Sequence, residues 1–294
     1  MLLANIGWGI MSPVTKSVLN TGSLTPIALS AVRIAGGATL FWLFTLLLPA
    51  SMGTRQRIDR ADVWRLVGAS LLMIAANQGL YIIGIGFTSP IDSAVMSTLT
   101  TVFTLILAAI FIGMPITRLK AFGVVLGLGG ALLMVMGGGV NRQATNPALG
   151  DLLCMSAQLC AAIYYVLFIP LIQKYSPFTL MKWMFTISAV TYVPCTWPWL
   201  SQVQFSQLPL SVIGQLAYII VVATFLSYLL IPYAQQYLKP TVMAMYNYFQ
   251  PVASAVVTAI LGVGVFGTTK IAATALIFVG VYCVSRATAP RPAS

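Results

Sequence analysis

The sequence predicts an all-α integral membrane protein with ten transmembrane helices, built as two five-helix repeats of inverted topology. Composition is the first observation, because 59% of the 294 residues are hydrophobic and only 6% are charged, against about 25% charged in a soluble domain. The second is that the apolar residues form continuous runs of about 20 residues, the length of a membrane-spanning helix. The third is a weak match of the chain with itself at an offset of 150 residues.

The apolar runs define the expected spans, which short polar connections separate. Such runs lack the alternation of a transmembrane β-strand, and lipid offers no partner to an exposed backbone, so each run is expected to be helical. The spans are 2–20, 26–49, 63–86, 90–112, 118–137, 149–172, 177–200, 209–236, 240–263 and 268–286.

The basic residues predict how these spans are oriented. An even number of spans places both termini on one side of the membrane, and the positive-inside rule favours the cytoplasm. In that orientation the cytoplasmic connections collect Arg55, Arg57, Arg60, Arg65, Arg118, Lys120, Lys174, Lys182, Lys239, Arg286 and Arg291, whereas the outer side receives Arg142 and Lys270. The net charge of +11 therefore reflects orientation, and we expect no nucleic-acid partner.

The internal match predicts the domain organisation. At the 150-residue offset, prolines, lysines and glycines pair, among them Pro90 with Pro240, Lys120 with Lys270, and Gly130 with Gly280. We therefore expect a first five-helix repeat over residues 1–137, an inter-repeat loop over 138–148 and a second repeat over 149–294. An odd number of spans in each half inverts the second half, which predicts a substrate site near the midplane between the halves.

Polar and aromatic side chains recur at equivalent places in the two halves. Amides that faced lipid would lack partners, so these side chains are expected to face the bundle interior or a wet cavity. Interhelical hydrogen bonding is the alternative for a single hydroxyl, and core packing is the alternative for a single ring. The candidate substrate-contacting residues are Trp8, Arg33, Asn77, Gln78, Tyr81, Met96, Thr100, Tyr164, Tyr228, Tyr246 and Gln250.

Charged residues within the spans are few. Lys16 is expected to snorkel to the outer surface. Arg33 lies about 10 Å into its span, so it is either a structural residue or the partner of a substrate carboxylate. Asp92 and Asp151 follow Pro90 and Gly150 at predicted helix starts, where a carboxylate complements the helix dipole. Because the chain has no histidine or glutamate, we expect uncoupled, facilitated transport.

Prolines and glycines mark places where helices bend or approach closely. Pro13, Pro232 and Pro251 each favour a kink that either gates the bundle or only shapes it. Gly123 and Gly127 have the spacing that lets another helix of the same chain approach.

The residue inventory argues against several classes of protein. The four cysteines lie scattered in apolar runs, and without histidine they predict no metal site and no cofactor. A membrane-embedded enzyme is a less favoured alternative, because its chemistry usually needs clustered His, Glu or Asp.

The chain resembles the EamA-type drug/metabolite transporter superfamily over essentially its whole length. The resemblance rests on Trp8-Gly9 to Lys16, Pro26 to Arg33, Leu80-Tyr81 leading to Pro90 and Ala94, and Tyr246 to Pro251. It implies ten helices in two inverted halves, alternating access and a central cavity. The row of aromatic residues is similar to that of amino-acid exporters, including aromatic amino-acid exporters.

The resemblance therefore implies export of amino acids and related small metabolites across a bacterial inner membrane, with no oligomer required. A drug, a nucleotide sugar or a lipid is the alternative cargo. One departure is that many EamA repeats carry a glutamate after the fourth helix, whereas this chain has Gly113-Met114-Pro115 there. No role of that acid transfers to this chain.

Overall fold

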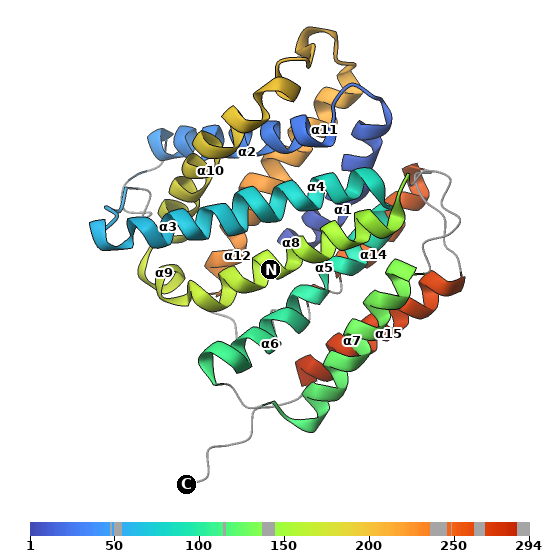
Figure 1. The fold of residues 1–294 in the computed structure, drawn as a ribbon. Coiled ribbons are helices and arrows are strands. Elements are labelled where there is room, and N and C mark those ends of the chain that lie inside the picture. The colour runs from blue at the N-terminus through green and yellow to red at the C-terminus, as the bar shows by residue number, and fades with distance from the viewer. Residues whose placement is uncertain are drawn as a thin grey trace.

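The structure is a computed structural model, and it describes residues 1–47, 49, 55–113, 116–136, 145–235, 246–247, 249–261 and 268–286. Within these ranges every regular element is a helix (Figure 1). The helices of residues 1–136 are α1 (Leu2–Asn20), α2 (Pro26–Leu47), η2 (Arg60–Asp62), α3 (Val63–Ser70), η3 (Leu71–Ala76), α4 (Asn77–Phe87), α5 (Pro90–Ser97), α6 (Leu99–Ile112) and α7 (Arg118–Met136).

The remaining helices begin at Pro147. They are α8 (Pro147–Leu167), α9 (Ile169–Lys174), α10 (Pro177–Leu200), η4 (Phe205–Gln207), α11 (Leu210–Ile220), η5 (Val221–Leu226), α12 (Ser227–Gln235), α14 (Phe249–Leu261) and α15 (Thr268–Arg286). The expected inter-repeat loop lies mostly outside the described residues, as does the part of the expected span 240–263 before Tyr246.

Several helices start with a capping residue followed by proline, which has no N–H to leave unpaired. The Ser89 hydroxyl accepts a hydrogen bond from the Asp92 N–H, and the Asn146 side chain accepts one from the Leu149 N–H. Ser176 caps α10 in the same way. Asp92 thus lies in the first turn of α5 as expected, but the capping oxygen belongs to Ser89.

Among the described residues, five helices are long and apolar enough to cross a membrane: Pro26–Leu47, Arg60–Phe87, Pro90–Ile112, Pro147–Leu167 and Leu210–Ala234. Large apolar side chains also point outward from the bundle, including Leu46, Ile110, Val125 and Ile260, which are 68–75% exposed. A water-soluble surface rarely carries so many. The exterior therefore suits lipid.

Helix bounds recur at the 150-residue offset. Helix α7 spans 118–136 and α15 spans 268–286, while α6 begins at residue 99 and α14 at residue 249. The two π-helices, η3 at 71–76 and η5 at 221–226, obey the same offset. Each π-helix leads directly into a polar pair, Asn77-Gln78 in α4 and Ser227-Tyr228 in α12.

Helices α7 and α15 lie side by side at one end of the bundle (Figure 1). A Cβ added to Gly130 would lie 2.8 Å from the Ala273 carbonyl oxygen, and one added to Gly280 would lie 2.6 Å from the Gly123 carbonyl oxygen. From Gly123 to Gly130 along α7, the facing residue on α15 goes from Gly280 back to Ala273, so the two helices are antiparallel. Equivalent glycines thus approach equivalent positions of the opposite helix.

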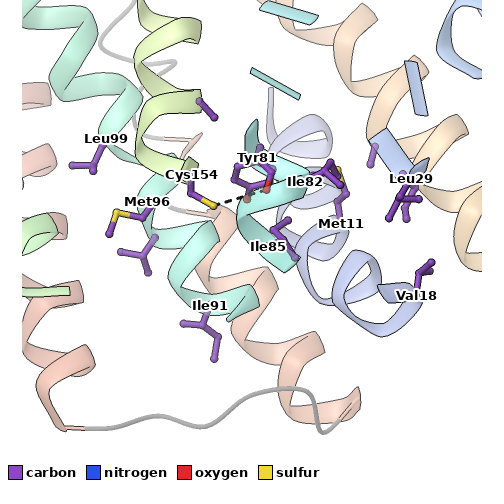
Figure 2. Packing of buried hydrophobic residues seen from close by; sticks show 14 of the residues in the cluster. Met11, Val18, Leu29, Tyr81, Ile82, Ile85, Ile91, Met96, Leu99 and Cys154 are labelled. Carbon is purple, nitrogen blue, oxygen red and sulfur yellow. Dashed lines mark hydrogen bonds between the residues drawn. The ribbon is translucent and has the colours of Figure 1, made fainter. Parts of the chain in front are cut away.

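A buried apolar cluster surrounds Tyr81 (Figure 2). It joins Met11 of α1 and Ile82 of α4 to Met96 of α5, and the Cys154 thiol of α8 lies 3.9 Å from the Tyr81 carbonyl oxygen. This cluster fixes α4 between α1, α5 and α8, so Tyr81 is held in a rigid part of the bundle.

The snorkelling predicted for Lys16 is wrong. Its side chain is buried, and its ammonium group donates hydrogen bonds to the carbonyl oxygens of Ile85 at 3.0 Å and Gly86 at 2.9 Å. These carbonyls lie at the C-terminal end of α4, where the helix dipole favours a cation. Lys16 therefore caps α4 and joins it to α1.

Candidate functional site

A partly open cavity of about 80 Å³ lies within the bundle. Among the described residues, its lining combines amides, hydroxyls, aromatic rings and methionines with a single arginine. The lining residues are Trp8, Met11, Arg33, Met73, Asn77, Gln78, Tyr81, Ser97, Thr100, Gln158, Ala161, Tyr165, Tyr228, Asn247 and Gln250. They come from both halves of the chain, so the cavity lies between segments far apart in sequence.

Arg33 is the charged residue among the described residues of this lining. Its side chain is only 2% exposed, and its Nε donates to the Thr224 hydroxyl at 2.6 Å while Nη2 donates to the Ala223 carbonyl oxygen at 3.3 Å. The guanidinium carbon also lies 5.9 Å from the centre of the Tyr228 ring. All of these partners are neutral. A guanidinium has five N–H donors, so Arg33 still has donors with which to bind an anionic ligand.

The π-helix η5 holds two residues of the cavity in place. The Ala223 carbonyl oxygen accepts from the Trp8 indole N–H at 2.9 Å as well as from Arg33. The Trp8 ring packs edge-on against Tyr228, with 5.4 Å between ring centres. π-Helical turns are frequent at functional sites, and this one joins α1 and α2 to the second half.

The amides of the lining differ in how they are bound. Gln250 donates to the Asn5 side-chain oxygen at 2.6 Å and accepts from the Ser97 hydroxyl at 2.6 Å. Asn77 donates to the Ala157 carbonyl oxygen at 2.7 Å. Gln78 is 1% exposed, and its amide makes no hydrogen bond of ordinary length and angle with a described residue, although the Tyr228 hydroxyl lies close enough to interact with it. Gln78 is therefore the amide that is available to a ligand.

The predicted site residues divide into two groups. Those that line the cavity are Trp8, Arg33, Asn77, Gln78, Tyr81, Thr100, Tyr228 and Gln250. Met96 lies in the apolar cluster of Figure 2, fully buried. Tyr164 is 1% exposed and packs against Tyr165 and Phe168. Tyr246 is half-buried and stacks on Phe249, with 6.3 Å between ring centres.

Four polar lining residues were not among the predicted ones. They are Ser97, Gln158, Tyr165 and Asn247. Thr100 donates to the Gln158 side-chain oxygen at 2.7 Å, which links the two. A signal existed for two of them, since Gln158, Ala161 and Tyr165 share a helix face at spacings of three and four residues.

The prolines proposed as gates take different positions. Pro13 and Pro232 lie inside α1 and α12. Pro251 lies in the first turn of α14, where a proline removes no intrahelical hydrogen bond.

Two aspartates meet away from the cavity lining. The Thr88 hydroxyl lies 2.6 Å from a carboxylate oxygen of Asp151 and 3.4 Å from one of Asp92. Both aspartates are 1% exposed. They tie the α4–α5 connection to the start of α8.

The other two acids form an ion-pair cluster at the start of α3. Lys174 lies 2.5 Å from Asp59 and 2.6 Å from Asp62, and the Tyr175 hydroxyl donates to Asp62 at 2.8 Å. The two carboxylates raise the pKa of Lys174 above its ordinary value. The Gln56 side-chain oxygen lies beside this cluster and accepts a hydrogen bond from the Ser176 N–H at 2.8 Å. The cluster joins residues 56–62 of the first half to 174–176 of the second.

A helical bundle with an apolar exterior and an internal polar, aromatic cavity is the architecture of a membrane transport protein. The family comparison agrees. The chain belongs to the EamA-like transporter family, whose model matches residues 1–136 and 148–286. It is therefore a multi-pass membrane transporter of the drug/metabolite transporter superfamily, and its family implies a small-molecule substrate.

Curated relatives agree with this family. An uncharacterized transporter of Archaeoglobus fulgidus is 24% identical over 95% of each chain. The uncharacterized transporter YyaM of Bacillus subtilis is 24% identical over 76% of this chain and 73% of its own. A WAT1-related protein of Arabidopsis thaliana is 29% identical over 63% of this chain and 51% of its own. One solved crystal structure shares the fold, with a TM-score of 0.64 at 16% identity over 96% of this chain and 94% of that one.

Proposed function

We propose that the protein exports amino acids, aromatic ones included, and related amphipathic metabolites across a bacterial inner membrane. The observation that carries this proposal is the cavity, in which the buried Arg33 and the buried Gln78 amide lie among aromatic rings. Arg33 meets the substrate carboxylate, the amides meet its other polar group, and Trp8, Tyr81 and Tyr228 enclose its apolar body.

The proposed architecture is ten spans in two inverted five-helix repeats, over residues 1–137 and 149–294, with both termini in the cytoplasm. The shared 150-residue offset of α7 with α15 and of η3 with η5 supports it. The antiparallel contact of Gly130 and Gly280 with equivalent positions is also what a two-fold axis in the membrane plane would produce. The halves then rock about the cavity in alternating access.

Transport is proposed to be uncoupled. The chain has no histidine or glutamate, and neither Asp92 nor Asp151 is among the residues that line the cavity. The substrate therefore follows its own gradient.

The test is uptake of labelled phenylalanine and leucine by liposomes that hold the purified protein. We expect saturable uptake above that of empty vesicles, without an imposed proton gradient. Absence of flux for every amino acid tested would overturn the proposed cargo. Flux that strictly needs a proton gradient would overturn only the uncoupled mechanism.

A further inference from the structure

The charges around the cavity are unbalanced. The chain holds four acidic residues in all, and every one of them lies in a described segment. Asp59 and Asp62 pair with Lys174 at the start of α3, whereas Asp92 and Asp151 lie around Thr88. No acid is among the described residues that line the cavity, and Arg33 is the one cation there.

The surroundings of Arg33 are neutral. Its two hydrogen-bond acceptors are the Thr224 hydroxyl and the Ala223 carbonyl, and the ionisable groups that act on its charge are the phenols of Tyr81 and Tyr228. Phenols are uncharged at neutral pH. A buried cation held only by neutral groups is costly in a membrane protein, and a ligand carboxylate would supply the missing charge.

The ammonium group of a ligand, in contrast, has no anionic partner among the described lining residues. The described lining residues offer it only neutral oxygens, such as that of the Gln78 amide, and the Tyr228 ring already faces Arg33. The guanidinium itself repels a second cation, and there is little water to screen the repulsion. The site therefore favours the carboxylate of an amino acid through Arg33, whereas it offers the ammonium group no charged partner.

We propose that the cavity selects monocarboxylates with an apolar or aromatic body, and that the α-ammonium group is not required. This inference rests on the proposed function and narrows it. The 2-hydroxy and 2-oxo acids that correspond to aromatic amino acids are then ligands of the same site, whereas amines and amino-acid amides are not.

Binding and flux are measured separately, so that the inference and the proposed function can fail independently. Binding is the rise in melting temperature of detergent-solubilised protein with four ligands that share one phenyl body. L-Phenylalanine carries both charges, and L-3-phenyllactate replaces the ammonium group by a hydroxyl. L-Phenylalaninamide and 2-phenylethylamine carry only the ammonium charge.

We expect phenyllactate to bind within about threefold of phenylalanine, and the two amines to bind about tenfold more weakly or worse, as befits loss of a charge-assisted bidentate pair. Arg33→Gln should abolish the preference for the carboxylates, whereas Arg33→Lys should keep part of it. Arg57→Gln, an exposed arginine outside the cavity lining, is the matched control and should behave as the wild type.

Amines that bind as well as phenylalanine, or phenyllactate that does not bind, would overturn the inference even if liposomes carry phenylalanine. Binding of the carboxylates without any flux would instead support the inference and overturn the proposed export. If Arg33→Gln fails to fold, the four ligands on wild-type protein decide the question alone.

Discussion

At the scale of single residues, the cavity contains two glutamines in opposite situations. Gln250 is satisfied on both sides by Asn5 and Ser97, so its amide holds α14 against α1 and α5. Gln78 is equally buried, but its amide makes no hydrogen bond of ordinary length and angle with a described residue, and Tyr228 is the neighbour that interacts with it. A buried amide without a partner destabilises a protein, and binding of a ligand would explain why such a residue is kept.

Gln78→Met should therefore separate stability from transport. The change conserves volume and removes an unpaired amide, so the melting temperature should stay the same or rise, while the KM for substrate rises. Gln250→Met is the matched control and should cost about 1–3 kcal/mol of stability, because it leaves Asn5 and Ser97 without their partner. Thermal melting and liposome uptake check both. A clear fall in the melting temperature of Gln78→Met would show that this amide is structural.

Sequence alone could predict the polar face of the cavity better than its aromatic side. Amides are expensive in lipid, so Asn77, Gln78 and Gln250 had to turn inward. Tyrosine combines an apolar ring with one hydroxyl, so it can pack in the core, at the interface or in a cavity, and its side of the helix is decided by packing. Two neighbouring tyrosines show this: Tyr165 lines the cavity, whereas Tyr164 packs into the core.

At the scale of elements, close packing of α7 and α15 depends on glycine. Without a side chain at Gly130 or Gly280, each backbone approaches the opposite helix directly. Small residues serve this purpose in membrane helices because apolar side chains gain little there by leaving lipid.

Gly130→Ala should therefore destabilise the protein by about 1–3 kcal/mol through overpacking, because the new Cβ would lie 2.8 Å from the Ala273 carbonyl oxygen. Gly129→Ala is the matched control on the same helix, since a Cβ there meets nothing within 4 Å. Melting temperatures of the two variants in detergent provide the comparison. Equal stability of the two would refute the glycine contact.

The helices themselves were predictable, since apolar runs and cap-proline starts such as Ser89-Pro90 define them. The irregularities of these helices were not predicted. The expected spans 90–112 and 149–172 are interrupted near Thr98 and Phe168, and η3 and η5 are π-helical within spans expected to be regular. The break at Phe168 directly precedes Pro170, at the start of α9, whereas η5 makes contacts with distant helices, such as those of Arg33 and Trp8 with Ala223, which local sequence does not encode.

At the scale of the whole molecule, the proposed rocking needs contacts that can open. The cluster of Gln56, Asp59, Asp62 and Lys174 joins the two halves, and the Lys174 side chain is 47% exposed. Exposed ion pairs contribute only about 0–1 kcal/mol. The exposed Lys174–Asp59 pair is therefore weak enough to break in the proposed cycle, whereas Asp62, whose side chain is 8% exposed, is the more firmly held part of the connection.

Tying this connection covalently should stop transport. With the native cysteines replaced, Gln56→Cys and Ser176→Cys would be joined by a short reversible thiol cross-linker. We expect liposome uptake to be lost after cross-linking and restored by reductant, because the halves can then separate again. Each single-cysteine variant, treated in the same way, controls for modification alone. Full uptake by the cross-linked protein would mean that the halves do not part at this point.

In the proposed mechanism, a carboxylate bound at Arg33 is carried across the membrane through this cavity. The most direct measurement is uptake of labelled phenylalanine into liposomes by wild-type protein, Arg33→Gln and the exposed control Arg57→Gln. Wild type and Arg57→Gln should show equal, saturable uptake, and Arg33→Gln should show about a tenfold loss or more in kcat/KM. Equal uptake by all three proteins would contradict the claim.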